Sequence, residues 1–261
     1  MNHTNTFGFI GGGRVTYFLL NALQQKNMLP KKIIVADPSE EVRNKIERIA
    51  PKTITAVIEN KNAAEMDVVF LAVHPPLIKE VVPEIKDKLK AGTIFISLAP
   101  VVSIEKLSNL LGGFDRIIRM IPNAPSIIHQ GYNPVAFGEG INNEEKLALF
   151  EVFKVWGEAP EVKERMLEAY AIITAMGPTY FWPQWVKLQQ LGKTFGMSDN
   201  ELKTAMPVML KSAVDLLYGA ELSTKEVMDL IPVYPLKDDE KTIQEIFEKK
   251  LSGLYQKLTG N

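Results

Sequence analysis

The chain contains no cysteine, which excludes disulfide bonds, thiolate metal sites and a cysteine nucleophile. Its three histidines, His3, His74 and His129, do not cluster at the spacing of metal ligands, so we expect no metal site. No stretch approaches about 18 uninterrupted apolar residues, and the first residues lack the layout of a signal peptide. These absences predict a soluble, cytoplasmic protein with no membrane partner.

An excess of charge of one sign is absent as well. The chain has 30 Lys and Arg residues against 31 Asp and Glu residues, which gives a net charge of −1. Nucleic acids and anionic membranes attract proteins through a strongly basic surface, so neither is expected as a partner. The length of 261 residues predicts one or two domains, and there is no internal repeat or low-complexity segment.

A glycine cluster follows the first apolar segment, which reads as a strand over residues 6–10. Gly11 and Gly13 stand at the first two positions of a dinucleotide fingerprint, whereas Thr16 stands where that fingerprint has Gly or Ala. Gly11 would permit a tight turn, and Gly13 would allow a pyrophosphate to approach. The helix that begins near Arg14 would direct its free N–H groups at the phosphates. The alternative is an ordinary strand–helix turn.

The second predicted strand, residues 31–37, ends in Asp37, close to the expected spacing of about 20 residues after the first glycine. Its carboxylate could accept hydrogen bonds from the adenosine ribose, which favours NAD because a 2′-phosphate would be repelled. In the alternative, Asp37 only caps the next turn, and Ser39 or Arg43 binds the 2′-phosphate of NADP.

Strands and helices alternate through residue 163, which predicts a mainly parallel, doubly wound sheet of the Rossmann type. Residues 67–73 form a fully apolar run, as in a strand that is covered on both faces. Val73, His74 and Pro75 follow the carboxyl end of that strand, where open α/β sheets bind ligands. His74 could contact the nicotinamide ribose or donate a proton, or it could be an ordinary loop residue. The further strands are expected at 93–97, 116–119, 134–137 and 158–163, and the helices at 14–23, 38–50, 77–89, 104–111 and 143–156, with Asn143 as the N-cap.

Helical periodicity dominates from residue 164, so we divide the chain into a dinucleotide-binding domain, 1–163, and a helical substrate and dimerisation domain, 164–261. Capping boxes begin at Ser198 and Ser223, and Pro183 and Pro207 should kink their helices or move a boundary. The apolar stripes of these helices need a partner surface. They form either a self-contained bundle or a symmetric dimer with interleaved helices. The helices are expected at 165–176, 180–195, 201–218 and 240–258.

Several motifs in order along the chain carry a family resemblance. They are Gly8–Gly13, Leu71–Pro75, Ile96–Ala99 with Val102–Leu107, the Arg-x-x-Pro-Asn-x-Pro segment Arg119–Pro125, and Gly177–Tyr180. With these motifs the chain resembles the pyrroline-5-carboxylate reductase family over nearly its whole length. The resemblance implies a nicotinamide-binding Rossmann domain, an all-helical dimerisation domain and an active site where the two meet. In that family, hydride passes from the nicotinamide to the carbon of a cyclic imine, giving proline.

The cofactor is expected to be NADP or NAD. Asn123 lies in a rigid loop between two prolines and could fix the nicotinamide amide, or it could simply be a turn residue. The full set of expected cofactor residues is Gly11, Gly12, Gly13, Arg14, Val15, Asp37, Val73, His74, Pro75, Ser97, Ala99 and Asn123.

The chain departs from the family where the substrate is held. The family's Pro-Gly-Gly-Thr-Thr loop, which binds the imino-acid carboxylate, aligns with Pro235–Asp239 and has lost its glycines and threonines. Two aspartates there would repel a carboxylate unless Lys237 compensates. The family's Ala-Ala-Gly is replaced by Ala99–Val101, and its Val-Lys-Pro-Gln by Val73–Pro76.

Thr174, Tyr180 and Asp238 are the candidates for catalysis, because reduction of a C=N or C=O bond requires a proton on the heteroatom. Asp238 could instead belong to an acidic start of the last helix. Three functions stay open: reduction of a small cyclic imino acid, reduction of another small carbonyl or imine by the same architecture, and non-catalytic binding of a nicotinamide dinucleotide. Against a β-hydroxyacid dehydrogenase, Lys187 is not preceded by the glycine-rich helix of those enzymes.

Overall fold

The computed structural model describes residues 6–260, and His3 therefore lies outside the described residues. The chain divides into two compact units. The first, which we call the sheet unit, runs to Met176 and takes in the chain from Tyr255 onward. The second, which we call the helical unit, comprises Gly177–Leu254.

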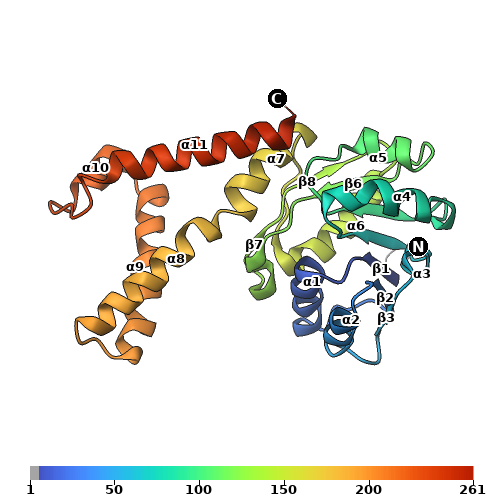
Figure 1. Ribbon diagram of the computed structural model, residues 1–261, viewed down its shortest axis with the longest axis horizontal. Coiled ribbons are helices and arrows are strands. Elements are labelled where there is room, and N and C mark those ends of the chain that lie inside the picture. The colour runs from blue at the N-terminus through green and yellow to red at the C-terminus, as the bar shows by residue number, and fades with distance from the viewer. Residues whose placement is uncertain (1–5, 261) are drawn as a thin grey trace. The chain divides into compact units, whose positions relative to one another are not determined.

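The sheet unit is built on a seven-stranded sheet with the order β3-β2-β1-β4-β5-β6-β8 (Figure 1). The first six strands of this order are parallel, and β8 pairs with β6 in the antiparallel sense. The predicted doubly wound, Rossmann-type sheet is thereby confirmed. The strands are β1 (Thr6–Ile10), β2 (Lys32–Ala36), β3 (Ile54–Val57), β4 (Val68–Leu71), β5 (Ile94–Ser97), β6 (Ile117–Met120) and β8 (Val135–Phe137).

Helices cover both faces of this sheet, because alternate residues of the buried strands point to opposite faces. One face packs against α1 (Arg14–Gln25), α2 (Glu40–Glu47) and α6 (Asn143–Phe153). The other packs against α3 (Asn60–Ala64), α4 (Ile78–Ile85) and α5 (Ile104–Leu110). Short 3₁₀ turns follow at Pro75–Leu77, Lys86–Lys88, Ala124–Ile128 and Lys154–Trp156.

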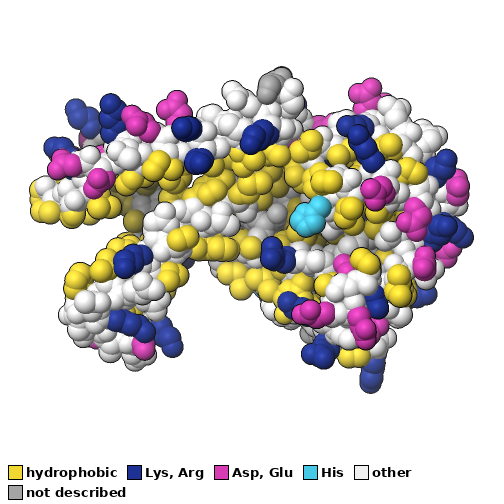
Figure 2. All heavy atoms as spheres, viewed as in Figure 1, with side chains coloured by type: hydrophobic (Ala, Val, Ile, Leu, Met, Phe, Trp, Pro, Cys, Tyr) yellow, Lys and Arg dark blue, Asp and Glu magenta, His cyan; other side chains and the backbone are white. Residues whose placement is uncertain are grey.

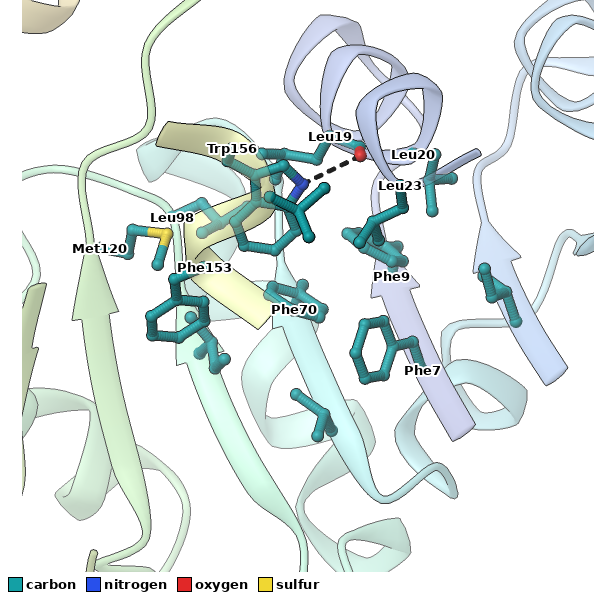
Figure 3. Close-up of a cluster of buried hydrophobic side chains, with 14 of the residues drawn as sticks. Phe7, Phe9, Leu19, Leu20, Leu23, Phe70, Leu98, Met120, Phe153 and Trp156 are labelled. Carbon is teal, nitrogen blue, oxygen red and sulfur yellow. Dashed lines mark hydrogen bonds between the residues drawn. The ribbon is translucent and has the colours of Figure 1, made fainter. Parts of the chain in front are cut away.

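The core on the first face is aromatic (Figure 3). The ring of Phe70 in β4 stacks on Phe9 with centroids 4.4 Å apart and meets Phe7 and Trp156 edge-on. Trp156 is fully buried, and its indole Nε1 donates to the carbonyl oxygen of Leu19 in α1 at 3.0 Å. This bond satisfies the polar end of the indole and fixes α1 against the sheet.

Three sequence predictions for the sheet unit were wrong in detail. β3 and α3 were missed, since both are short; Gly8 makes room for α3, because a Cβ there would lie 1.9 Å from the Ala63 carbonyl oxygen. The strand expected over 158–163 shrinks to β9 (Gly157–Glu158), which pairs with β7 (Gly131–Tyr132) in a separate two-stranded sheet. The N-cap of α6 is Asn142 rather than Asn143, because Asn142 and Glu145 form the capping box.

The segment 164–176 belongs to the sheet unit and is not one regular helix. A 3₁₀ turn (Glu164–Met166), a single α turn α7 (Leu167–Tyr170) and a π-helical turn (Ala171–Ala175) follow one another. The boundary between the compact units therefore falls after Met176, whereas the sequence analysis placed the domain boundary after residue 163.

The helical unit contains α8 (Pro178–Thr194), α9 (Asp199–Gly219), α10 (Thr224–Asp229) and most of α11 (Glu240–Thr259). Both predicted capping boxes are present, at Ser198 and Ser223, and Pro183 and Pro207 lie inside α8 and α9 without ending them. Apolar side chains lie exposed along these helices (Figure 2). Phe195 is 77% and Tyr218 is 83% exposed.

Candidate functional site

The loops that follow the parallel strands lie at one edge of the sheet, because parallel strands all end on the same side. In doubly wound sheets this carboxyl edge is where ligands bind. The segments that it brings together in the sheet unit are the glycine turn after β1, Asp37 after β2, Val73–Pro75 after β4, Leu98–Val101 after β5 and Ile121–Asn123 after β6.

The glycine turn is held close to the neighbouring strands at Gly11. Its backbone N–H donates to the carbonyl oxygen of Ala36 at 2.8 Å, and its φ is +100°, which only glycine adopts readily. A Cβ at Gly11 would lie 2.6 Å from the backbone oxygen of Ala72. A Cβ at Gly12 would lie 2.8 Å from Cγ1 of Val42. Gly11 is therefore required by its own backbone conformation and by a backbone neighbour, whereas the neighbour of Gly12 is a side-chain methyl group that can shift.

Gly13 differs, because a Cβ at this position would meet no described atom within 4 Å. Gly13 is the N-cap residue of α1, and it has no side chain to cap the helix. The first N–H groups of α1, from Arg14 and Val15 onward, thus start beside open space, which is the arrangement that binds a pyrophosphate. A nicotinamide dinucleotide fits this turn.

Thr16, at the third fingerprint position, is fully buried, and its hydroxyl donates to the Gly11 carbonyl oxygen at 2.6 Å. A threonine at this position therefore closes the turn with a hydrogen bond and leaves the open space at Gly13 unchanged.

Asp37 is joined to the glycine turn directly. Its Oδ2 accepts from the Gly12 N–H at 2.8 Å, and its Oδ1 accepts from the Ser39 N–H at 2.9 Å. Arg43 donates through Nη1 to the carbonyl oxygens of Asp37 and Pro38. The carboxylate stands between the turn and α2, where an adenosine ribose would lie.

The loops after β4 and β5 contribute apolar and backbone surface. His74 is exposed, and its carbonyl oxygen accepts from Leu77 N–H at 2.9 Å, so the residue starts the 3₁₀ turn after β4. Ser97 and Ala99 are buried, and the Ser97 hydroxyl accepts from the Ala99 N–H at 3.4 Å. The side chains of Ser97 and Ala99 therefore pack inside the protein at the end of β5.

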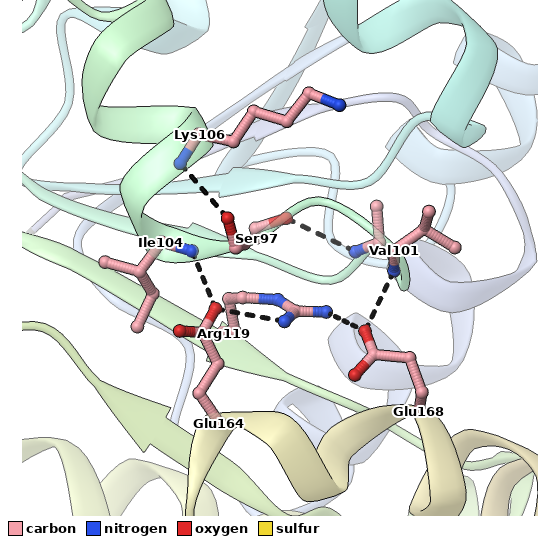
Figure 4. Close-up of polar contacts among 9 residues, drawn as sticks. Ser97, Val101, Ile104, Lys106, Arg119, Glu164 and Glu168 are labelled. Carbon is pink, nitrogen blue, oxygen red and sulfur yellow. Dashed lines mark hydrogen bonds and ion pairs between the residues drawn. The ribbon is translucent and has the colours of Figure 1, made fainter. Parts of the chain in front are cut away.

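Figure 4 shows an ion-pair network beside the loop that follows β5, here called the β5 loop. The sequence analysis did not predict this network. Arg119 in β6 pairs through Nη2 with Glu168 at 2.6 Å and through Nη1 with Glu164 at 3.0 Å. The same carboxylates accept from the backbone N–H groups of Val101, at 3.1 Å, and Ile104, at 2.6 Å. We call Arg119, Glu164 and Glu168 the Arg119 network; it ties the β5 loop to the segment before the helical unit.

Asn123 is buried and joins two segments of the sheet unit. Its Oδ1 accepts from the Tyr132 N–H at 3.0 Å, and its Nδ2 donates to the Thr174 carbonyl oxygen at 3.5 Å. The Thr174 hydroxyl donates to the Tyr170 carbonyl oxygen within the π-helical turn. The structure thus brings Asn123 and Thr174 together. π-Helical turns occur frequently at functional sites.

The other two catalytic candidates lie in the helical unit. The ring of Tyr180 in α8 lies 6.0 Å from that of Phe247 in α11, and burial raises the pKa of its hydroxyl. A surface pocket of about 570 Å³ is lined by Tyr180, Lys187 and Leu236 among others. Asp238 lies in the exposed turn before α11, and the Asp239 carbonyl oxygen accepts from Ile243 N–H at 3.0 Å, as at a helix start.

Two features are absent from residues 6–260. No group of three or more His, Cys, Asp or Glu side chains is arranged to hold a metal ion. No helix in this range is both long and apolar enough to cross a membrane.

The chain is similar in sequence to known oxidoreductases. The family model of coenzyme F420-dependent NADP oxidoreductases matches residues 6–100. A pyrroline-5-carboxylate reductase of Corynebacterium melassecola is 29% identical over 226 residues, which are 85% of this chain and 80% of that protein. A pyrroline-5-carboxylate reductase of Escherichia coli K12 is 28% identical over 176 residues, which are 66% of this chain and 64% of that protein.

Solved structures extend the likeness to the whole chain. The pyrroline carboxylate reductase of Plasmodium falciparum with NADP bound has a TM-score of 0.83 at 21% identity, covering 99% of this chain and 98% of that chain. A pyrroline-5-carboxylate reductase of Coxiella burnetii has a TM-score of 0.71 at 25% identity, covering 99% of this chain and 96% of that chain.

Proposed function

We propose that the chain is a member of the pyrroline-5-carboxylate reductase family and that it reduces the C=N bond of a small cyclic imino acid with NADH or NADPH. Pyrroline-5-carboxylate, which would give proline, is the first candidate substrate. The observation that carries the proposal is the glycine turn. Gly11 and Gly12 are enclosed by protein, whereas Gly13 faces open space at the start of α1. This difference between neighbouring glycines is what a bound pyrophosphate requires.

In the proposed complex, the sheet unit binds the dinucleotide. The N–H groups at the start of α1 hold the pyrophosphate, and Asp37 accepts hydrogen bonds from the adenosine ribose. Val73, His74, Pro75, Ser97, Ala99 and Asn123 shape the remainder of the cofactor site. When bound, the nicotinamide supplies a hydride to the imine carbon.

The nitrogen of the imine receives a proton in the same reduction, and we assign this side of the site to Thr174, Tyr180 and Asp238. Burial raises the pKa of the Tyr180 hydroxyl, so at neutral pH this group would hold the imine nitrogen by a hydrogen bond and be a weaker acid than a free tyrosine. We keep the division of roles at residue 163, with substrate binding and dimerisation assigned to 164–261. The start of that part, 164–176, packs within the sheet unit and brings Thr174 next to Asn123.

We further propose that the protein works as a homodimer or a higher homo-oligomer through the helical unit, in the cytoplasm, where reduced nicotinamide dinucleotides are regenerated. The exposed apolar side chains of α8 and α9 support the dimer, because contiguous apolar patches on a protein surface mark interaction sites. The test is a mass measurement by light scattering across a dilution series. A mass of one chain at every concentration would overturn the oligomer.

A second candidate function is supported by the turn before α11. Residues 235–239 are exposed and carry two aspartates, and no glycine is available there to offer backbone N–H groups to a carboxylate. This observation favours a substrate without a carboxylate at that position, such as another small imine or carbonyl compound. The third candidate function is dinucleotide binding without catalysis.

The test measures oxidation of NADH and of NADPH, in parallel, with pyrroline-5-carboxylate and with a panel of small imines and keto acids. Nucleotide affinity is titrated separately by fluorescence. Turnover of pyrroline-5-carboxylate supports the proposal. Turnover of a different panel member alone would replace it with the second candidate. Tight nucleotide binding without any turnover would leave only the binding function, and absence of nucleotide binding would overturn all three.

A further inference from the structure

Val101 has a backbone conformation that is unusual for its residue type. Its φ is +79°, in the region where glycine is common and a β-branched residue is strained. In residues 6–260 the other non-glycine residues with positive φ are Asn27 and His129, whose side chains tolerate this region better. Strained residues persist only where surrounding structure fixes them, and they cluster at ligand sites.

The Arg119 network supplies that fixation. The Val101 N–H donates to Oε1 of Glu168, and the same oxygen accepts from Arg119 at 2.6 Å. The side chains of Arg119 and Glu168 are only 3% and 10% exposed, so water competes little with these bonds. Ile104, three residues after Val101, donates its N–H to Glu164, which also pairs with Nη1 of Arg119 (Figure 4). The loop is therefore held at two points.

The position of this loop is that of a ligand-binding loop. It follows β5, whose last residue Ser97 is in register with Leu71 at the end of β4. Val101 thus lies in the same row of carboxyl-edge loops as Val73 and the glycine turn. Its backbone N–H is bound by the buried carboxylate of Glu168, yet the residue is 42% exposed. Val101 is thus fixed in its backbone and still accessible to a ligand at this edge of the sheet.

We propose that Val101 is a specificity-determining residue whose isopropyl group packs against the nicotinamide end of the bound dinucleotide and narrows the space beside the reacting ring. A valine here fills room that the glycine of the family leaves open, so a five-membered cyclic imine should be favoured over a six-membered one. Arg119 and Glu168 are positioning residues that act through the Val101 backbone. The proposal rests on the proposed dinucleotide function and adds the size limit of its substrate.

The first experiment titrates purified full-length protein with NADH and with ADP-ribose, which lacks the nicotinamide. Val101→Gly should weaken NADH binding about three- to tenfold and leave ADP-ribose affinity unchanged, because the lost contact lies at the nicotinamide end. It should also raise the melting temperature, since glycine adopts a φ of +79° without strain.

The matched control is Asn27→Gly, which relieves a positive φ of 55° beyond the far end of α1, about 18 Å from the glycine turn. It should change neither affinity. Equal NADH affinities in the wild type and Val101→Gly, or a parallel loss for both ligands, would overturn the proposal.

The second experiment compares kcat/KM for five-membered and six-membered cyclic imino acids. Val101→Gly should shift this ratio toward the larger ring by tenfold or more, and Val101→Ala by less. Glu168→Ala should reproduce the shift, because the loop is released. Glu168→Gln should preserve the wild-type ratio, because an acceptor oxygen for the Val101 N–H remains.

An unchanged ring-size ratio in both Val101 variants contradicts the size limit. If the wild type turns over neither imine, the proposed reaction fails, and the comparison of NADH with ADP-ribose still decides whether Val101 contacts the nicotinamide end.

Discussion

The sheet unit and the helical unit differ in what their apolar side chains contact. The sheet unit buries its strands on both faces, with Phe70, Phe9 and Trp156 in one of two clusters. In residues 177–254, all described by the structure, the buried residues are Gly177, Gly192 and Leu202. The sheet unit is therefore stabilised by its own core, whereas the helical unit has apolar faces that its own helices leave open.

This difference parallels the difference in the family motifs. The glycine turn carries one of the motifs of the family resemblance, and a Cβ at Gly11 would lie 2.6 Å from the backbone oxygen of Ala72. The turn 235–239 in the helical unit is exposed and has lost the family's glycines and threonines. A segment enclosed by its own fold is constrained by packing, while an exposed turn is free to follow a changed substrate or partner.

The largest expected effect comes from core truncation in the sheet unit. Phe70→Ala should lower the free energy of unfolding by about 3–5 kcal/mol, because a fully buried ring leaves a cavity. The matched change in the helical unit, Phe195→Ala, should cost less than about 0.5 kcal/mol in dilute solution. Urea denaturation measures both. A concentration-dependent loss for Phe195→Ala would show that a second chain covers this face.

The next effect concerns the open space at Gly13. Gly13→Val should weaken dinucleotide binding about 100-fold or more, about 2.7 kcal/mol, without unfolding the protein, because the new side chain meets no protein atom and takes the place of the pyrophosphate. Gly92→Val, also in open space but before β5 at the opposite edge, is the control and should bind normally. Isothermal titration distinguishes them. Wild-type affinity in a folded Gly13→Val would refute the assigned pyrophosphate site.

Cofactor preference should change by a smaller factor. Asp37→Ser removes the carboxylate that would repel a 2′-phosphate, and it should shift the ratio of NADPH to NADH affinity about tenfold toward NADPH, about 1.4 kcal/mol. Ser39→Ala nearby retains the carboxylate and should leave the ratio near that of the wild type. The ratio is measured by fluorescence titration. If only Ser39→Ala moved it, the alternative role of Ser39 at the 2′-phosphate would hold.

Capping boxes in the two units offer a matched pair with a smaller effect. Asn142→Ala at the start of α6 and Ser198→Ala at the start of α9 should each destabilise their helix by about 1 kcal/mol. Hydrogen exchange should report the first as global unfolding and the second as local opening of the helical unit. Identical exchange patterns for the two variants would contradict the contrast between the units.

The smallest effect is expected at alkaline pH. Burial, the neighbouring Tyr170 and Glu158 raise the pKa of Tyr132 above its ordinary 10.0. A folded-state pKa above the unfolded one adds stability that is complete below pH 10.0 and is lost as the pH rises through the folded value. Tyr132→Phe should therefore flatten the decline of the urea midpoint above this pH. If the urea midpoint of Tyr132→Phe declined as steeply as that of the wild type, other groups would cause the decline. Tyr180→Phe is the matching variant in the helical unit.

Much of the sheet unit could be predicted from the sequence, because long buried strands and amphipathic helices have strong periodicity. The apolar run of β4 and the glycine turn are examples, since each depends on neighbours in sequence. β3 and α3 escaped notice because they are only four and five residues long, and because α3 depends on close packing against the distant Gly8. The irregular helix over 164–176 also depends on a distant residue, Arg119.

The candidate site also contains residues that local sequence predicts and residues that depend on distant contacts. Gly11, Gly13 and Asp37 were predicted from spacing alone. In the structure Asp37, which follows β2, accepts a hydrogen bond from Gly12, between the two glycines. The Arg119 network could not be read from the sequence, because its charges are separated by more than forty residues and nothing local pairs them. One signal was present: Val101 stands where the family has a glycine, and its positive φ is what that glycine would have accommodated.

The threonine at the third fingerprint position has a practical consequence. In this turn the Thr16 hydroxyl adds one hydrogen bond, to the Gly11 carbonyl oxygen, to those that Gly11 and Gly12 donate to Ala36 and Asp37. Exchanging that oxygen for a methyl group, as in Thr16→Val, alters neither the volume nor the charge of the helix start. The stiffness of the glycine turn can therefore be changed through one atom, without a change to the glycines that shape it.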